Sequence, residues 1–265
     1  MKFDQPFRVK LLQIGDSGAG KTTSIASVVN AGYRVPVIDF DNNMRIVQSY
    51  LDKPENASKI SRIPINPNDD DKIGKKSRSS EKLMKVLTSD WIDPDTQENW
   101  GKIPTWGLDT VLFLDTATYM GKMFMRDALL RYKGDKNPNG YDPDAAANFD
   151  QTVYNLAQQK FNAVVKFLSS DDIKCNVVLN MHLKYSEEQG TGMTRGYPDT
   201  GVGKALGPSL GKDFTDVWRI DDKNNKKFYR TQGDHRMSLK NSAPKIIAIE
   251  EEFDLGKALN KLLGK

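Results

Sequence analysis

A glycine-rich stretch, Gly15-Asp16-Ser17-Gly18-Ala19-Gly20-Lys21-Thr22, has the spacing Gly-x4-Gly-Lys-Thr. Glycines let a backbone curl closely enough for its N–H groups to face a phosphate. Lys21 would meet the β- and γ-phosphates as a point charge, and the Thr22 hydroxyl would bind Mg²⁺. The stretch from Gly15 to Thr23 therefore predicts a binding site for a nucleoside triphosphate.

The neighbours of this stretch have the order that a phosphate-binding loop requires. An apolar run over Arg8–Ile14 predicts a buried strand before it, and Ser24–Asn30 predicts a helix after it. The helix would direct the positive end of its dipole toward the phosphates. A glycine-rich turn that serves packing alone is the alternative, but the strand, loop and helix together favour nucleotide binding.

A second chemical signal is the carboxylate that ends the apolar run Thr110–Asp115. Ligands of open α/β sheets collect at the carboxyl ends of the strands, so Asp115 is expected to face the phosphate loop. There it would hold Mg²⁺ together with Thr22. The alternative is that Asp115 caps the following helix.

Three further residues follow predicted strands and are candidates for catalysis. Asp41, after the predicted strand Tyr33–Phe40, would polarise the attacking water as a general base, or it is an ordinary loop aspartate. His182 would sense the γ-phosphate, or it is structural. Lys240 would reach the phosphate of a neighbouring subunit, or it is a solvated surface lysine.

The remaining periodicity predicts a doubly wound, mostly parallel α/β sheet flanked by helices. We expect the strand Tyr33–Phe40 to lie beside the first strand. Further strands are predicted at Ile60–Ile65, Asn176–Met181, Val217–Ile220 and Lys227–Arg230, and helices after Ser79 or Ser80 and at Met120–Tyr132 and Phe149–Leu168. Val153, Leu156, Phe161, Val164 and Phe167 are expected to line one face of the last helix.

The amino-acid composition is that of an ordinary soluble protein, and the chain length of 265 residues fits one domain. We expect a polar insertion around residues 66–107, packed down by Trp91, Trp100 and Trp106, and loop-rich segments around 133–148 and 184–211. Cys175 is the single cysteine, so disulfides and cysteine-based metal sites are not expected. No membrane span or signal region is predicted, which favours a cytoplasmic location, in the host cell if the protein is viral.

Several classes of nucleotide-binding protein are disfavoured. A GTPase would carry Asn-Lys-x-Asp, which the chain lacks, and a glycine three residues after Asp115, where Thr118 stands. A chromosome-partitioning ATPase would have lysine near the start of the loop, at the place of Asp16. A helicase or AAA+ motor would commonly have glutamate at the place of Thr116, so a catalytic acid must come from elsewhere.

The order of these motifs resembles that of the RecA-like P-loop ATPases, and more closely that of their short phage relatives that act in single-strand annealing or recombination. The resemblance covers most of the chain and rests on Val37–Asp41, Leu112–Thr116, Leu179–His182, Gly203–Lys212, Phe214–Ile220 and Ser238–Asn241. It implies that Asp41 takes the place of the catalytic glutamate, Asp115 binds the metal and His182 senses the γ-phosphate. It also implies that Lys240 is a basic finger across a subunit interface.

In the RecA-like plan two loops beyond the strand ends face DNA, here residues 119–150 and 184–204. Lys184, Arg195 and Lys204 would neutralise phosphates, and Tyr197 would stack on unpaired bases. A net charge of +4 permits contact with a polyanion such as DNA but does not require it. The alternative is that the second loop only covers the nucleotide.

The sequence therefore predicts an ATPase that uses ATP and Mg²⁺ and acts on single-stranded DNA in recombination, repair or annealing. A homo-oligomeric ring or filament is expected. The rival hypotheses are a DNA motor or loader, and a nucleotide-gated assembly protein or kinase that does not bind DNA.

Overall fold

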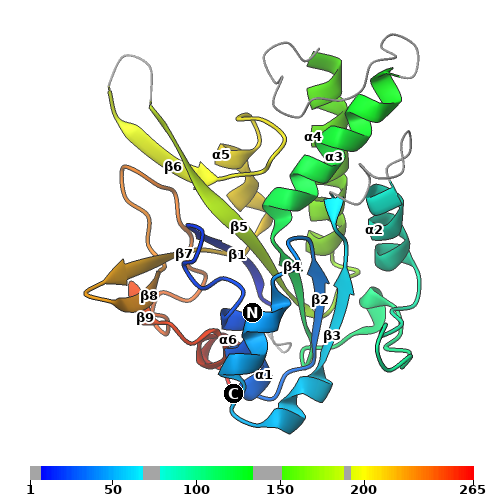
Figure 1. The fold of residues 1–265 in the computed structure, drawn as a ribbon. Helices are drawn as coiled ribbons and strands as arrows, with labels where there is room; N and C mark the ends of the chain where they lie inside the picture. The colour runs from blue at the N-terminus through cyan, green and yellow to red at the C-terminus, as the bar shows by residue number, and fades with distance from the viewer. Residues whose placement is uncertain (1–6, 68–77, 134–150, 188–191) are drawn as a thin grey trace.

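The computed structural model describes residues 7–67, 78–133, 151–187 and 192–265 (Figure 1). The strands are β1 (Lys10–Gly15), β2 (Val35–Asp39), β3 (Ile60–Pro64), β4 (Val111–Asp115), β5 (Asn176–Glu187), β6 (Thr194–Pro198), β7 (Asp216–Lys223), β8 (Lys226–Arg230) and β9 (Glu250–Glu252). The α-helices are α1 (Ser24–Asn30), α2 (Arg78–Thr88), α3 (Ala117–Lys133), α4 (Gln151–Ser169), α5 (Gly207–Leu210) and α6 (Leu255–Leu263). Short 3-10 helices occupy Met44–Tyr50, Pro54–Lys59, Ile103–Thr105 and Gly211–Asp213.

The strands form one sheet in the order β3-β2-β4-β5-β1-β7-β8-β9, with β6 paired to the end of β5. The six strands from β3 to β7 pair in parallel, and β8 and β9 continue the sheet in antiparallel pairing. Because the parallel strands run the same way, β1, β2, β4 and β5 all end at one edge. This is the mostly parallel α/β sheet flanked by helices that the sequence predicted.

Side chains of the central strands point alternately to the two faces of the sheet, and each face packs into its own hydrophobic core. Leu12 and Leu114 lie in the core shared with α3 and α4, whereas Leu11 and Phe113 lie in the core shared with α1 and α6. Strands covered on both faces are apolar throughout, which explains why β4 is buried at every position. Figure 1 shows α3 and α4 side by side, with α1 and α6 together elsewhere on the sheet.

Two expectations about packing were wrong. The strand β2 does not lie beside β1, because β4 and β5 stand between them. Leu156 on α4 is 37% exposed, although Val153, Phe161 and Val164 are buried and Phe167 packs partly against the core. The three tryptophans of the 66–107 segment are buried as expected, and the Trp91 indole donates a hydrogen bond to Ser61.

The segment expected to be loop-rich after Lys184 contains a β-hairpin instead. β5 continues past the sheet to Glu187, and β6 pairs with it from Leu183↔Pro198 to Glu187↔Thr194. In Figure 1 this hairpin projects beyond the strand ends on the side where α3 and α4 also extend. Part of the other expected loop, residues 134–148, lies outside the described residues, as do residues 68–77 of the polar insertion.

Candidate nucleotide-binding site

The phosphate loop connects the buried strand β1 to the helix α1. Gly18 and Gly20 have φ values of 78° and 108°, a region that residues with a Cβ rarely adopt. A Cβ on Gly20 would also lie 2.8 Å from the Phe253 ring. The two glycines are therefore required by backbone shape and, at Gly20, by close packing.

Lys21 lies inside the loop, with only 4% of its surface exposed. Its Nζ donates hydrogen bonds to the carbonyl oxygens of Gly15 (2.8 Å) and Asp16 (2.7 Å). Burial lowers the pKa of Lys21 to about 8, although Asp115, Asp16 and Asp41 favour its charged form. A bound anion would favour the ammonium further, so this site suits a phosphate.

Thr22 and Asp115 meet at the end of the sheet, as the strand-end argument expected. The Thr22 hydroxyl donates a 2.7 Å hydrogen bond to Asp115 Oδ2, and Asn180 Nδ2 donates to Oδ1 at 2.9 Å. Asp115 is fully buried; burial raises its pKa, while the bonds from Thr22 and Asn180 oppose the rise. This carboxylate therefore stands in a site where a cation would stabilise it.

Sequence reasoning missed two buried amides beside the loop, Gln13 on β1 and Asn180 on β5. Gln13 Nε2 donates to Ser24 Oγ at 3.2 Å, and Asn180 Nδ2 also lies 3.3 Å from the Lys21 carbonyl oxygen. The signal for both was a polar residue inside an otherwise apolar strand. They fix the loop and the carboxylate relative to the central strands.

Asp41 lies just beyond β2, close to Asp115 and Asp39. Burial, followed by the charges of Asp115 and Asp39, raises the pKa of Asp41 to about 7. Asp39 itself accepts hydrogen bonds from the backbone of Asp41 (3.2 Å) and Asn42 (2.9 Å), and it pairs with Arg62 at 2.7 Å. Asp39 and Arg62, which the sequence did not single out, thus hold the segment that carries Asp41.

His182 ends the buried part of β5 and is partly exposed. Its backbone N–H donates to Thr118 Oγ1 at 3.0 Å, and its ring meets the Tyr119 ring edge-on with centroids 6.0 Å apart. Burial, followed by the charge of Lys21, lowers the pKa of His182. The imidazole is therefore neutral near pH 7 and stands within electrostatic reach of Lys21.

The donors at this site fit Mg²⁺ bound together with phosphates. Mg²⁺ prefers oxygen ligands and is usually held by one or two carboxylates plus phosphate and water. Thr22 and Asp115 supply a hydroxyl and a carboxylate oxygen 2.7 Å apart. Among the described residues, no cluster of three or more His, Cys, Asp or Glu side chains could hold a metal ion without further ligands. Beside Asp115, the buried oxygens Thr116 Oγ1 and Asn180 Oδ1 have no hydrogen-bond partner within the described part of the chain.

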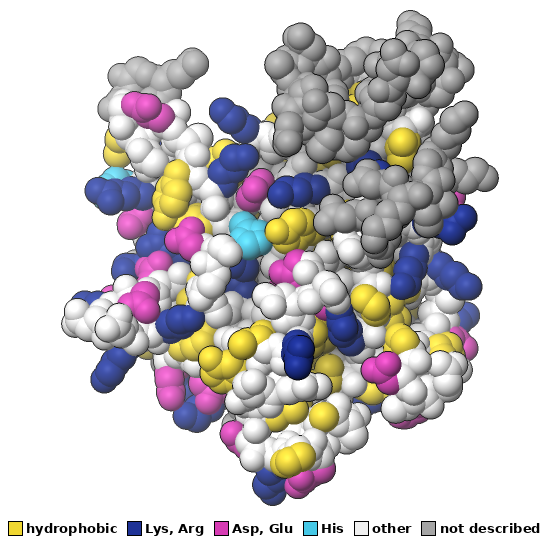
Figure 2. Space-filling model, in the orientation of Figure 1, with side chains coloured by type: hydrophobic (Ala, Val, Ile, Leu, Met, Phe, Trp, Pro, Cys, Tyr) yellow, Lys and Arg dark blue, Asp and Glu magenta, His cyan; other side chains and the backbone are white. Residues whose placement is uncertain are grey.

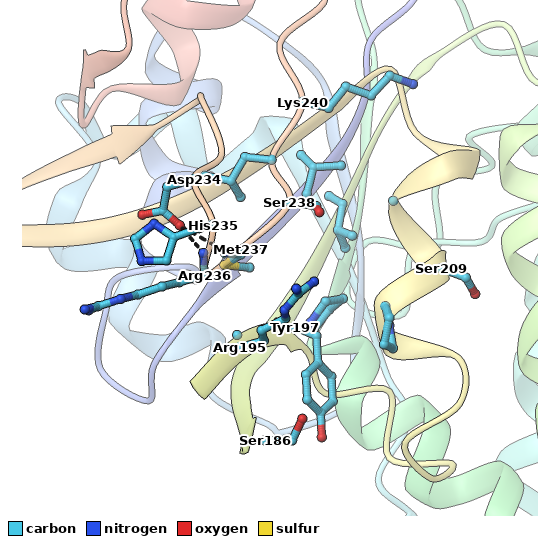
Figure 3. A pocket seen from close by; sticks show the side chains of 18 of the residues that line it. Ser186, Arg195, Tyr197, Ser209, Asp234, His235, Arg236, Met237, Ser238 and Lys240 are labelled. Carbon is cyan, nitrogen blue, oxygen red and sulfur yellow. Dashed lines mark hydrogen bonds between the residues drawn. The ribbon is translucent and has the colours of Figure 1, made fainter. Parts of the chain in front are cut away.

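Lys240 lies away from this cluster. It pairs with Val217 through the backbone, and its Nζ donates to the Phe214 carbonyl oxygen at 2.6 Å. Lys240 lines a cavity of about 920 Å³ between the β5–β6 hairpin, α5 and residues 234–240. Figure 3 shows Arg195 and Tyr197 on the hairpin side of this cavity, with Ser209 on α5 across from them.

The four expected DNA-binding residues lie on or near the hairpin, and all of them except Tyr197 are exposed. Arg195 and Lys204 are exposed, and Lys184 is half exposed with its Nζ 3.9 Å from Asp199. Tyr197 is only 7% exposed, so stacking of a base on its ring is not possible in this conformation, whereas Tyr185 is 53% exposed. Figure 2 shows Lys and Arg side chains interspersed with Asp and Glu on this face.

The fold and site together define a P-loop protein of the α/β class. The Gly-x4-Gly-Lys-Thr loop follows β1, Asp115 ends β4, and the buried strand β5 lies between these two strands. Comparison with family models matches residues 8–243 to the AAA domain family AAA_24. The chain belongs to this family. Thr116, which follows Asp115 where an AAA+ motor commonly has glutamate, is therefore compatible with an AAA domain.

Comparison with curated proteins gave no match. Among solved structures, a crystal structure of the RadB recombinase matches with 15% identity and a TM-score of 0.43, over 87% of this chain and 84% of that chain. This likeness is too distant to bear on function.

Proposed function

We propose that the protein binds ATP and hydrolyses it with Mg²⁺ at the loop Gly15–Thr23. The observation that carries this proposal is the 2.7 Å contact between Thr22 and Asp115, beside the buried ammonium of Lys21. A hydroxyl and a carboxylate from two separate elements meet where the loop would hold a triphosphate. The AAA domain family, matched over residues 8–243, supports a nucleotide-binding role for the protein.

The side chains around the loop have distinct roles in this proposal. Lys21 exchanges its two carbonyl acceptors for phosphate oxygens and stabilises the charge that develops on them. Asp41, whose pKa is raised to about 7, accepts a proton from the attacking water. His182 is neutral and donates a hydrogen bond to the γ-phosphate. Mg²⁺, held by Thr22 and Asp115, would neutralise charge on the β- and γ-phosphates.

We further propose that the protein acts on single-stranded DNA in recombination, repair or annealing, as a homo-oligomer. The support is the β5–β6 hairpin, which carries exposed Lys184, Tyr185 and Arg195 beyond the strand end that also bears His182. Cations and an exposed aromatic ring suit phosphates and unpaired bases. The shared strand β5 links this surface to the nucleotide site.

The test is the rate of ATP hydrolysis with and without Mg²⁺ and with and without single-stranded DNA. We expect hydrolysis to require Mg²⁺ and to rise when DNA is added. The double variant Arg195→Ala, Lys204→Ala should lose the DNA effect while it keeps the basal rate. The control Lys53→Ala, Lys85→Ala removes the same charge from exposed positions elsewhere and should keep both. Hydrolysis that DNA never alters, without DNA binding at low salt, would contradict the DNA proposal and favour a nucleotide-gated assembly protein.

A further inference from the structure

A second lysine lies at the phosphate loop, and it comes from the late strand β8. Lys227 Nζ donates a 3.0 Å hydrogen bond to the Gly18 carbonyl oxygen and lies 3.3 Å from the place of a Cβ on Gly20. Within the described residues, this carbonyl is the single hydrogen-bond acceptor of Lys227 Nζ. An ammonium has three donors, so two remain for another acceptor.

The exposed side chain of Lys227 lies beside an aromatic cluster. Phe253 lies 5.9 Å from Lys227 Nζ, within cation–π range, and contacts Gly20 closely. The Phe253 ring in turn packs on Tyr229, with centroids 5.1 Å apart. Tyr229 is fully buried, so the Phe253 ring beside Lys227 packs on a residue of the core.

The C-terminal segment is also anchored to the helix that follows the loop. A Cβ on Gly256 would lie 2.2 Å from the Ser27 carbonyl oxygen, and Gly256 N donates to Ser27 Oγ at 3.2 Å. The backbone of α6 therefore packs directly on α1. The loop, α1, α6 and the Phe253 ring therefore pack together, and Lys227 lies beside this group of elements.

We propose that Lys227 is a nucleotide-phosphate ligand supplied by the same chain, with Phe253 as its positioning residue. This inference rests on the proposed ATP site. Lys240, which the sequence suggested for the phosphate of a neighbouring subunit, donates to the Phe214 carbonyl oxygen within its own chain and lines the cavity beside α5.

The test is the affinity for Mg·ATP of four variants, measured by titration calorimetry together with thermal unfolding. Lys227→Met and Lys227→Gln should each weaken binding about tenfold, the effect of losing a hydrogen bond to a charged group. Lys227→Arg should stay close to wild type, and Lys226→Ala, on the neighbouring exposed lysine, should bind as wild type. All four should unfold at the wild-type temperature.

The glutamine variant separates phosphate binding from a purely structural role. Glutamine can still donate to the Gly18 carbonyl but carries no charge. If Lys227→Gln binds ATP within about twofold of wild type, Lys227 only braces the loop and the inference is wrong. In that case Lys21→Ala would still lose ATP binding, so the proposed function would stand.

Mixing Lys21→Ala with Lys227→Met, at an ATP concentration too low for Lys227→Met to bind well, tests whether Lys227 acts within its own chain. A subunit with Lys21→Ala retains Lys227, and a subunit with Lys227→Met retains the loop lysine. If Lys227 serves its own loop, the mixture hydrolyses ATP no faster than the sum of the two variants. Recovery on mixing would show that Lys227 acts on a neighbouring subunit and would overturn the proposal.

Discussion

At the scale of single residues, the site is a set of polar side chains buried in apolar strands. Gln13, Asp39, Asp115 and Asn180 are each at most 1% exposed. Burying such groups costs free energy unless they are hydrogen-bonded. Gln13 and Asn180 donate to the Lys21 carbonyl oxygen, Asp115 accepts from Thr22, and Asp39 accepts from the backbone of the Asp41 segment. These residues therefore serve to position the loop, the carboxylate and the candidate base.

Asp41→Asn tests the proposed general base. Removal of a general base should slow hydrolysis about 100-fold or more, whereas ATP binding should persist because the change also removes a negative charge near the phosphates. Asp52→Asn, at an exposed position, is the matched control and should hydrolyse normally. Hydrolysis by Asp41→Asn at the wild-type rate would assign the base to another residue.

The raised pKa of Asp41 gives this role a pH dependence. The carboxylate is the active form, so the wild-type rate should fall on the acid side, with a midpoint at or below about 7. Bound Mg²⁺ shifts that midpoint downward because its charge opposes the repulsion from Asp115 and Asp39. The free energy of unfolding depends on pH in the opposite sense. Because folding favours the protonated form of Asp41, the contribution of Asp41 to stability is present at low pH and is lost as the pH rises to about 7.

At the scale of elements, the sheet edge brings the nucleotide site and the hairpin together. Thr118, in the first turn of α3, donates to the Asp199 carbonyl oxygen (2.7 Å) and accepts from the His182 backbone (3.0 Å). Asp199 N donates to the His182 carbonyl oxygen at 2.8 Å. The end of β6 is thus tied to both the helix after Asp115 and the strand end at His182.

Gly121 on α3 completes this junction, and its replacement should weaken it. A Cβ at this position would lie 1.6 Å from the Thr200 carbonyl oxygen, which is backbone and cannot rotate away. Gly121→Ala should lower the free energy of unfolding by about 1–3 kcal/mol, the usual effect of overpacking. Gly107→Ala, whose Cβ would lie 3.3 Å from the flexible Asp109 side chain, is the control. Equal denaturation midpoints for the two variants would contradict this packing.

Most elements were predictable because their signals are local. Apolar runs marked β1, β2, β4 and the buried part of β5, and the Ser24–Asn30 helix was placed correctly. The order of the strands was not, because the insertion of β4 and β5 between β1 and β2 depends on long-range pairing. The hairpin was missed because Lys184–Glu187 and Thr194–Gly196 are polar and exposed or half exposed, so no buried face gives them a period.

The sequence also predicted only part of the candidate site. Contiguous motifs gave the loop, and strand ends gave Asp115, Asp41 and His182. Lys227 and Phe253 could not be found this way, because they reach the loop only after β8 and the C-terminal segment fold back onto α1. Their roles, like those of Lys240 and the hairpin cations, remain predictions for the variants above.

At the scale of the whole molecule, helices on both faces of the sheet make the strand ends one rigid platform. None of the described helices is long and apolar enough to cross a membrane. The platform presents the phosphate loop at the end of β1 and the hairpin at the end of β5, with Lys227 approaching from β8. The candidate nucleotide site and the hairpin therefore lie at the same end of the parallel strands, as the proposed function requires.

The most direct test of the central claim is the rate of Mg²⁺-dependent ATP hydrolysis by wild type and Lys21→Ala, each purified and confirmed as folded. Lys53→Ala, an exposed lysine far from the loop, is the control. The account predicts hydrolysis by wild type and by the control, and none above background by Lys21→Ala, because the ammonium buried in the loop is the group that holds the phosphates. Hydrolysis by Lys21→Ala at the wild-type rate would contradict it.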